Sequence, residues 1–107
     1  MKSPPRGEVW LVDLGLAAKV RPCLVLSVPI EDADRTLVAL VPHTTSPRSS
    51  RFEAAVGTKF LKPGAFDAQG MASVPLARLV RRVGVLSPLQ VADVERVVQA
   101  WLGLRSA

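Results

Sequence analysis

The strongest constraint on the fold of this chain comes from two runs of apolar, β-branched residues. Each run is bordered by a polar residue of a kind that is rare in a hydrophobic core. The first run covers Val20–Ser27, and the second ends at Val41, directly before Pro42–Ser46. Such runs are typical of buried strands. Arg21 comes just before the first strand and Thr44 at the end of the next, so neighbouring strands would bring a fixed cation and a hydroxyl to one rim of a sheet. This pair suits phosphate binding, although a solvated strand start and a turn also account for it.

Most of the remaining chain is predicted to form short strands joined by brief turns. We expect an acidic turn over Pro29–Asp34 and a polar, basic loop over 46–51. Short strands followed by one terminal helix favour a mainly β fold, a small and strongly curved barrel that is partly open. The expected strands are Glu8–Leu14, Pro22–Val28, Thr36–Val41, Phe52–Val56, Ala65–Ser73 and Leu79–Leu86.

The C-terminal segment predicts an amphipathic helix. Ser87 suits the N-cap, Pro88 suits the first helical position, and Gln90 completes a capping box. Gly103 is a natural end. The polar face is not basic, so the helix is expected to pack on the sheet and to have no membrane role. Its apolar face is predicted to contain Val94, Val97, Val98, Trp101 and Leu102.

Length and charge indicate one basic domain over residues 1–107. The net charge is +5, and residues 48–82 contain seven basic side chains against two acidic ones, while Glu31, Asp32 and Asp34 cluster elsewhere. This segregation favours a polyanionic partner such as nucleic acid. No apolar run is long enough to span a membrane and no signal peptide begins the chain. Cys23 is the only cysteine, so no internal disulfide forms and a reducing, cytoplasmic setting is expected.

Several kinds of chemistry are disfavoured by the residues present. One histidine and one cysteine cannot supply a zinc site, and the acidic cluster lacks the spacing of a calcium loop. No glycine-rich phosphate loop and no serine-hydrolase elbow is visible. We therefore expect no metal and no cofactor. Any catalysis would depend on Arg, Thr, Ser, His and backbone groups.

The order of the short motifs resembles the MazF/PemK family of toxins, the endoribonucleases of type II toxin–antitoxin systems. Arg6–Gly7–Glu8 opens the domain, Arg21–Pro22 begins the second strand, Pro42–Ser46 ends the third, and Arg78–Ser87 leads into the final helix. The resemblance implies an SH3-like barrel that forms homodimers. It also implies sequence-specific cleavage of single-stranded RNA such as mRNA, without metal, to 2′,3′-cyclic phosphate and 5′-OH ends. A cognate antitoxin with an acidic tail would neutralise the activity.

The same resemblance places Arg21 and Thr44 on the two catalytic positions of the family. Cleavage by the adjacent 2′-OH suits them, because the protein must chiefly orient the RNA and stabilise a more negative phosphate. Arg21 would supply charge and Thr44 a hydrogen bond. His43 is a third catalytic candidate, since imidazole titrates near neutrality. On an extended strand, however, His43 would accompany Thr45 on the face opposite Thr44.

Residues past Thr44 are candidates for binding the RNA backbone. They are Thr45, Ser46, Arg48 and Arg51, and a solvated loop is the alternative for the two arginines. The chain departs from the family in the short, apolar connection Gly15–Lys19 and in the absence of an arginine after Gln69. Both departures affect base recognition, so the cleavage sequence cannot be inferred.

Two further functions fit the same sequence. One is a non-catalytic toxin of this fold that poisons DNA gyrase, as in the related CcdB branch. The other is an SH3-like RNA-binding module without chemistry. The pairing of Arg21 with Thr44 favours cleavage over both.

Overall fold

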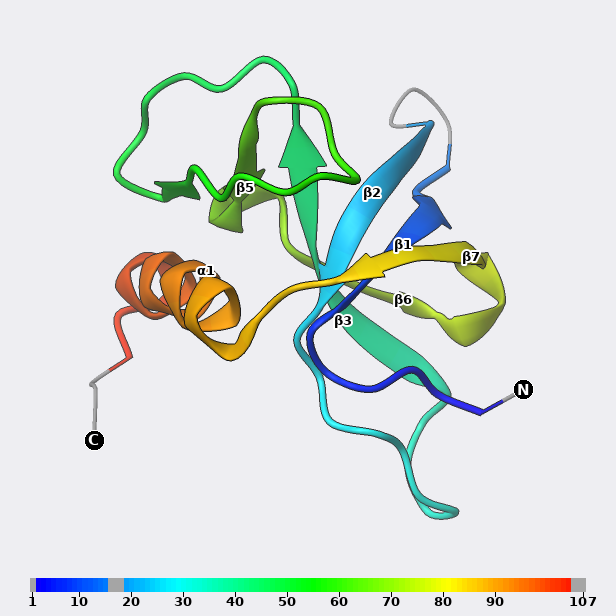
Figure 1. The fold of residues 1–107 in the computed structure, drawn as a ribbon. Coiled ribbons are helices and arrows are strands. Elements are labelled where there is room, and N and C mark those ends of the chain that lie inside the picture. The colour runs from blue at the N-terminus through cyan, green and yellow to red at the C-terminus, as the bar shows by residue number, and fades with distance from the viewer. Residues whose placement is uncertain (1, 16–18, 105–107) are drawn as a thin grey trace.

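The computed structural model describes residues 2–15 and 19–104 and shows a curved antiparallel sheet with one long helix at its side (Figure 1). Two short 3-10 helices, η2 (Ala68–Gly70) and η3 (Leu76–Arg78), interrupt the later strands. The helix is α1 (Pro88–Leu102). The strands are β1 (Glu8–Asp13), β2 (Val20–Val25), β3 (Leu37–Thr44), β4 (Glu53–Ala54), β5 (Ala65–Asp67), β6 (Ala72–Pro75) and β7 (Leu79–Val85).

The strands form a partly open barrel, as predicted. Their order is β4-β5-β3-β2-β1-β7, and β6 also pairs with β3. All the pairings are antiparallel. Two register shifts between β1 and β7 mark irregularities at which the sheet can bend sharply.

Strand β3 connects the two parts of the sheet. Its first half pairs with β6, from Leu37 to Leu40, and Leu40–Pro42 pair with β2. Its last residues, His43 and Thr44, pair with β5 instead. The strand thus passes from one set of neighbours to another, and its end lies where β2, β5 and the following loop meet.

Both faces of the Cys23–Val25 segment of β2 are buried, which explains why this segment is apolar without interruption. Leu24 contributes to a core cluster that also contains Phe66 from β5 and Val94 from α1. Its neighbours Cys23 and Val25 face the other way, into a second cluster within the curve of the sheet. Successive side chains of a strand point to opposite faces, so a strand with two covered faces needs apolar residues at every position.

Helix α1 confirms the predicted caps. The Ser87 hydroxyl accepts a hydrogen bond from the Gln90 backbone N–H, and the Gln90 side chain accepts one from the Ser87 N–H. Gly103 ends the helix in the left-handed conformation at φ 69°. The predicted apolar face is only partly correct, since Val94 and Val98 are buried but Trp101 and Leu102 are 42% and 49% exposed. In the last turn, the Trp101 ring meets Phe52 edge to face, with centroids 5.1 Å apart.

Several predicted strand boundaries need correction. Strand β2 begins at Val20, so Arg21 lies within the strand and pairs with Val12 of β1. The predicted strand Ala65–Ser73 is two strands separated by η2, because Asp67 caps a turn by accepting a hydrogen bond from the Gln69 N–H. Only Glu53–Ala54 form the strand expected over Phe52–Val56.

The structure bears on two expectations drawn from composition, the burial of Cys23 and the length of apolar segments. Cys23 is fully buried, as expected of a small apolar side chain. The helices in the described part of the chain include none with the length and apolarity needed to span a membrane.

The capping box gives the first prediction. Replacing Ser87 with alanine leaves the Gln90 N–H without its acceptor, so the free energy of unfolding should fall by about 1 kcal/mol. Urea unfolding followed by circular dichroism measures the change. Ser49→Ala is the matched control, since it removes a hydroxyl outside any helix. Equal stability of the Ser87 variant and the wild-type protein would contradict this role.

Candidate functional site

The site lies where β2 and β3 separate. Their ladder runs from Val25–Leu40 to Cys23–Pro42 and ends there. Proline has no N–H to donate, so Pro42 on one strand and Pro22 on the other both weaken further pairing. The two strand ends are thereby freed from each other while β1 and β5 still hold them from outside.

Arg21 and Thr44 lie at these separated ends. Continuing the register of the ladder by two residues brings Arg21 opposite Thr44. Both side chains line a cavity of about 610 Å³, called here the larger cavity. The sequence prediction that two strands bring this cation and this hydroxyl to one rim is therefore consistent with the structure. The larger cavity is lined by Leu14, Arg21, Pro42, His43, Thr44, Ser46, Arg48, Ser50, Glu53, Asp67, Gln69 and Gly70.

A second cavity of about 360 Å³, called here the smaller cavity, shares Arg21 and His43 with the larger one. These two residues therefore form the boundary between the cavities. The smaller cavity combines cations with apolar side chains from the loop before β5. It is lined by Lys19, Val20, Arg21, Pro22, His43, Thr45, Phe60, Leu61 and Lys62.

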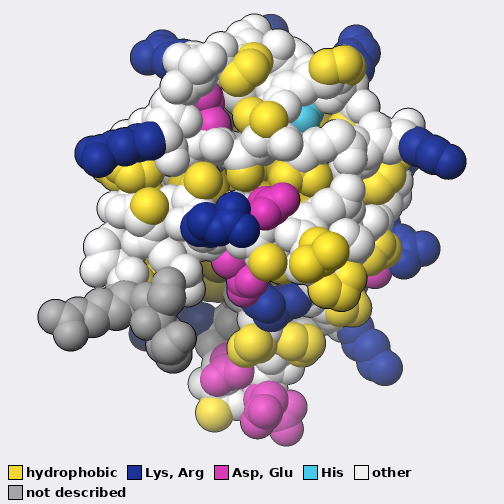
Figure 2. Space-filling model, turned by 60° about the vertical axis from the view of Figure 1, so that its left-hand side comes forward, with side chains coloured by type: hydrophobic (Ala, Val, Ile, Leu, Met, Phe, Trp, Pro, Cys, Tyr) yellow, Lys and Arg dark blue, Asp and Glu magenta, His cyan; other side chains and the backbone are white. Residues whose placement is uncertain are grey.

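The two cavities differ in charge. The smaller one has three cations, Lys19, Arg21 and Lys62, and no carboxylate among its lining residues. The larger one combines Arg21 and Arg48 with the carboxylates of Glu53 and Asp67. Figure 2 shows basic side chains at the periphery and near the centre of one face, with acidic ones at its lower end and also beside the central basic groups. The two signs are therefore interspersed on this face, and the segregation predicted along the sequence does not appear there.

Glu53 has a structural task that explains its presence. Its carboxylate accepts hydrogen bonds from the backbone N–H groups of Arg48 and Ser50, at 3.1 and 2.8 Å. These bonds lower the pKa of Glu53 below its usual value, with the bond from Arg48 contributing most. The ionised carboxylate thus holds the loop over 46–50 in place and keeps Arg48 at the cavity wall.

Thr44 is oriented by its own loop. Its Oγ1 accepts a hydrogen bond of 3.1 Å from the Ser46 N–H. A hydroxyl that accepts in this way retains its proton for donation. The arrangement leaves the Thr44 hydroxyl able to donate a hydrogen bond to a group in the larger cavity.

His43 forms part of the wall between the cavities and is only 3% exposed. Its ring meets Phe66 edge to face, with centroids 5.1 Å apart. Burial lowers the pKa of His43 below 6.5, so the ring is neutral at pH 7. Of its two ring nitrogens, Nε2 is buried and makes no hydrogen bond with the described residues.

Two glycines keep the loop that bears Phe60 close to the site. A Cβ on Gly64 would lie 2.1 Å from the Thr44 carbonyl oxygen and 2.8 Å from His43 Cε1. A Cβ on Gly84 of β7 would lie 2.5 Å from the Phe60 ring. Such distances are too short for any side chain, so glycine at both positions allows the loop to rest against β3 and β7.

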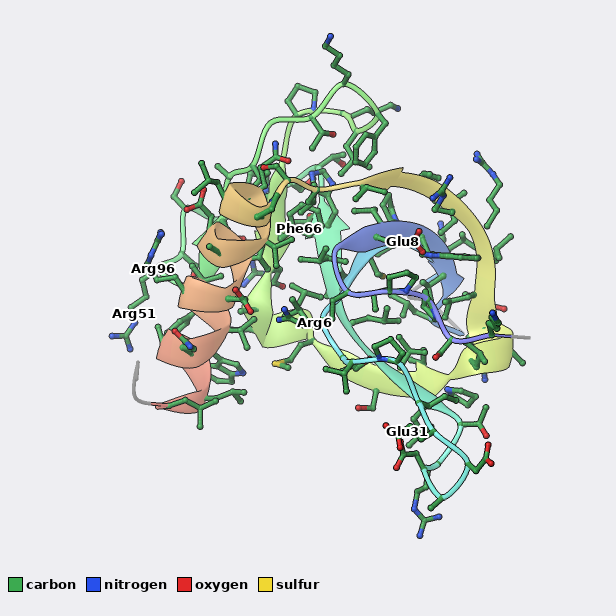
Figure 3. The ribbon with its side chains drawn as sticks, turned by 60° about the horizontal axis from the view of Figure 1, so that its bottom comes forward. Arg6, Glu8, Glu31, Arg51, Phe66 and Arg96 are labelled. Carbon is green, nitrogen blue, oxygen red and sulfur yellow. The ribbon has the colours of Figure 1, made fainter. Side chains whose placement is uncertain are left out.

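The structure distributes the predicted RNA-binding residues unevenly. Ser46 and Arg48 line the larger cavity and Thr45 the smaller one. Arg51 lines neither, because its guanidinium stacks on Phe52, 4.5 Å from the ring centroid, and points outward beside α1 (Figure 3).

Several lining residues were not identified from the sequence. Lys19, Phe60 and Lys62 belong to turns whose position depends on tertiary packing, and Asp67 and Gln69 looked like part of one strand. The available signals were the basic character of residues 59–62 and the departures from the family pattern in the connection Gly15–Lys19 and near Gln69. Leu16, Ala17 and Ala18, in the connection predicted to affect base recognition, lie outside the described residues.

Neither the thiol nor the carboxylates suggest a metal site. Burial raises the pKa of the Cys23 thiol to about 12, so it stays protonated and cannot ligate a metal or act as a nucleophile at neutral pH. Within residues 2–15 and 19–104, no three side chains of His, Cys, Asp or Glu are grouped to hold a metal ion.

Comparison with known structures supports this description of the fold. The chain is similar to an endoribonuclease from a mycobacterial species, with a TM-score of 0.82 and 23% identity over 100% of this chain and 98% of that one. A mycobacterial endoribonuclease in complex with its cognate antitoxin gives a TM-score of 0.82 and 24% identity, over 98% and 100% of the two chains. A MazE–MazF complex from Deinococcus radiodurans gives 0.78 and 20%, over 95% and 97%.

The open antiparallel sheet with a C-terminal helix therefore defines the class of small SH3-like barrels that have the MazF fold. A family model described as PemK-like, MazF-like toxin of type II toxin–antitoxin system matches residues 5–102. The chain belongs to this family, and the resemblance read from its motifs is confirmed.

The buried histidine gives the second prediction. The unfolded chain binds a proton at His43 near pH 6.5, whereas the folded protein does so only at lower pH. The unfolded state therefore binds more protons below pH 6.5, and the free energy of unfolding should decrease as the pH falls through this range. Well above pH 6.5, His43 is neutral in both the folded and the unfolded state and no longer changes the free energy of unfolding with pH.

An NMR titration of the single histidine measures its pKa directly, and urea unfolding at several pH values measures the stability. His43→Leu should reduce the slope of stability with pH between 7.5 and 5.5. A titration midpoint at or above 6.5 would show that the ring is not buried in solution.

Proposed function

We propose that this protein is a metal-independent endoribonuclease toxin that cuts single-stranded RNA, such as mRNA, in a sequence-specific manner. The products would be a 2′,3′-cyclic phosphate and a 5′-OH end. The observation that carries the proposal is that Arg21 and Thr44, from the ends of two neighbouring strands, line the same cavity. Family membership and similarity to endoribonucleases support the same activity.

The proposed reaction needs little from the protein beyond orientation and charge. The 2′-oxygen loses its proton and bonds to the adjacent phosphorus, the bond from phosphorus to the 5′-oxygen breaks, and the departing 5′-oxygen takes a proton from solvent to become the 5′-OH. Arg21 would hold two non-bridging oxygens as negative charge grows on the phosphate, because its guanidinium is planar and permanently charged. Thr44, oriented by Ser46, would donate a hydrogen bond to the same phosphate or to the 2′-oxygen.

We propose His43 as the group that accepts the proton of the 2′-OH. It lines both cavities next to Arg21, and burial keeps its imidazole neutral, which is the form that accepts a proton. Since Nε2 is the buried nitrogen, Nδ1 would be the acceptor. The histidine has an accessory role in this mechanism, and Arg21 and Thr44 have the main ones.

The cations around the two cavities support binding of an RNA backbone on either side of the scissile phosphate. Arg48 would contact one flank, with Ser46 beside it, and Lys19, Lys62 and Thr45 the other. Contacts of this kind make binding weaken as salt rises. Arg51 would act at the outer edge, if it leaves Phe52.

We further propose that the chain acts as a homodimer in the cytoplasm and is neutralised by an acidic cognate antitoxin. Similar structures include toxin–antitoxin complexes, which supports the antitoxin. Exposed apolar side chains on β7 and α1, such as Val80, Val85 and Leu89, are available for protein contacts. A free cysteine accords with a reducing compartment.

The first test of the mechanism uses substitutions at the paired positions. Arg21→Lys keeps the charge but loses the bidentate contact, so cleavage should fall by about 10²–10³-fold. Thr44→Ala should also cleave slowly, whereas Thr45→Ala should stay near the wild-type rate. Cleavage of a labelled RNA measures all three. His43→Gln should lower the rate by about 10²-fold and remove an inflection in the pH–rate profile.

The variants also show which assignment is wrong if the prediction fails. A wild-type rate for Arg21→Lys would mean that the phosphate binds elsewhere. A slow Thr45→Ala and a normal Thr44→Ala would move the reacting groups to the smaller cavity, beside His43. Thermal unfolding of each variant separates loss of activity from loss of fold.

The decisive test of the reaction is a substrate without its nucleophile. An oligonucleotide with deoxyribose 5′ to the scissile phosphate should bind but remain uncut, and should inhibit cleavage competitively with an affinity that falls as salt rises. The assay runs in EDTA, in which the wild-type protein should retain activity on ordinary RNA.

Each failure has a separate meaning. Cleavage of the deoxy-substituted oligonucleotide at the same position would exclude attack by the 2′-OH. Loss of activity in EDTA that returns with a divalent ion would exclude the metal-free mechanism. If no RNA were cut, a gyrase-directed toxin or an RNA-binding module would explain the fold better.

A further inference from the structure

Asp67 is a carboxylate in a cavity that the proposed function assigns to a polyanion. Negative charge there opposes phosphate binding, so its presence needs a reason. Glu53 has one, because both of its oxygens accept backbone hydrogen bonds from the 48–50 loop. Asp67 is different, since its Oδ1 accepts one bond of 3.0 Å from the Gln69 N–H and its other oxygen, Oδ2, makes no hydrogen bond with the described residues.

The position of Asp67 is fixed from both sides. It lies at the end of β5, where it pairs with Glu53 of β4, and it caps the short helix η2. The turn that follows is seated on β3, because a Cβ on Gly70 would lie 2.9 Å from Pro42 Cγ and 3.3 Å from Asp67 Oδ2. The carboxylate is therefore held at a set distance from the strand that bears Thr44.

The chemistry of the unused oxygen limits what it can bind. An ionised carboxylate only accepts hydrogen bonds, and it repels phosphate oxygens and base carbonyls. The donors that single-stranded RNA offers are base N–H and amino groups on edges that pairing no longer covers. In recognition of nucleic-acid bases, Asp and Glu accept from the amino group of cytosine.

We propose that Asp67 reads a base with an exocyclic amino group, and so selects cytosine over uracil among the pyrimidines, in the larger cavity next to Arg21 and Thr44. Cytosine presents an amino group where uracil presents a carbonyl oxygen, which the carboxylate disfavours; the one N–H donor on the pairing edge of uracil, at N3, lies between two carbonyl oxygens that repel the carboxylate. This inference rests on the proposed function, because it assumes that RNA enters the larger cavity. The sequence departs from the family pattern near Gln69, and so did not predict which base is recognised. This inference assigns that recognition to the side chain of Asp67.

Asp67→Asn is a test that changes one atom type. Asparagine keeps an oxygen to cap the Gln69 N–H, so η2 should remain, but it presents an NH₂ donor to the base in place of an acceptor. The preference should then shift from the amino group of cytosine to the carbonyl of uracil. Asp34→Asn is the matched control, because Asp34 also caps a backbone N–H, that of Glu31, and lies in the acidic loop away from both cavities.

The measurement uses 2′-O-methylated oligo(C) and oligo(U) of equal length, which cannot be cut through the 2′-oxygen. Fluorescence anisotropy gives the ratio of their dissociation constants for the wild-type protein and both variants. We expect about tenfold tighter binding of oligo(C) by the wild-type protein and by Asp34→Asn. For Asp67→Asn the ratio should approach one or reverse. Cleavage of ordinary RNA is measured on the same preparations.

The outcomes separate this proposal from the nuclease function. An unchanged ratio in Asp67→Asn, an equal loss of affinity for both oligonucleotides, or no measurable binding of either would overturn the role of Asp67, whether or not ordinary RNA is cut. A changed ratio without any cleavage would support the base-reading role and reject the nuclease. Cleavage of ordinary RNA with an unchanged ratio would do the opposite.

Discussion

The interruption of the β2–β3 ladder at Cys23 and Pro42 is the constraint on which the site depends. Up to that pair, backbone hydrogen bonds and apolar clusters on both faces hold the strands together. Beyond it, two prolines remove donors at the point where pairing would continue. The strands remain anchored by their outer neighbours, so they part without losing order. A cavity forms between the two ordered strand ends, and the backbone of its strand residues is held in place by the sheet.

Because of this geometry, the polar groups on the two sides of Arg21 differ in charge. Arg21 lies at the boundary of two cavities that differ in charge, one with cations only and one with cations and carboxylates. The cation-only cavity also presents Phe60 and Leu61; under the proposed function these would allow stacking and phosphate contact without selection of a base. The mixed cavity offers hydrogen-bonding groups from β2, β3, β4, β5 and η2 and from the loop over 46–50. A nucleic-acid chain crossing Arg21 would thus meet a permissive side and a selective side.

The sequence predicted the parts of this arrangement that depend on local signals. Residues close together in the sequence determine the helix from Pro88 with its Ser87 cap. They also determine the apolar strands, and the placing of Arg21 and Thr44 on two of these strands. The division of Ala65–Ser73 was missed because Asp67 forms a local cap that competes with the extended conformation. The start of β2 was placed too late because Val20 and Arg21 pair with β1. Trp101 and Leu102 follow the helical period but remain partly exposed, with Trp101 packed on Phe52. Lys19, Phe60 and Lys62 line the smaller cavity from loops. The position of these loops depends on their packing against distant strands, which a local sequence pattern does not predict.

The contact between Gly84 and Phe60 has a consequence for variation within this fold. Gly84 belongs to β7, on the far side of β1 from the strands that bear Arg21 and Thr44, and it lines neither cavity. Yet the absence of its side chain sets how closely the Phe60 loop approaches the sheet. A larger residue at position 84 would displace the Phe60 ring, which lines the smaller cavity, and so change the shape of that cavity without replacing any lining residue. The shape of the smaller cavity therefore depends on a residue outside its lining, and a comparison of lining residues alone would miss position 84.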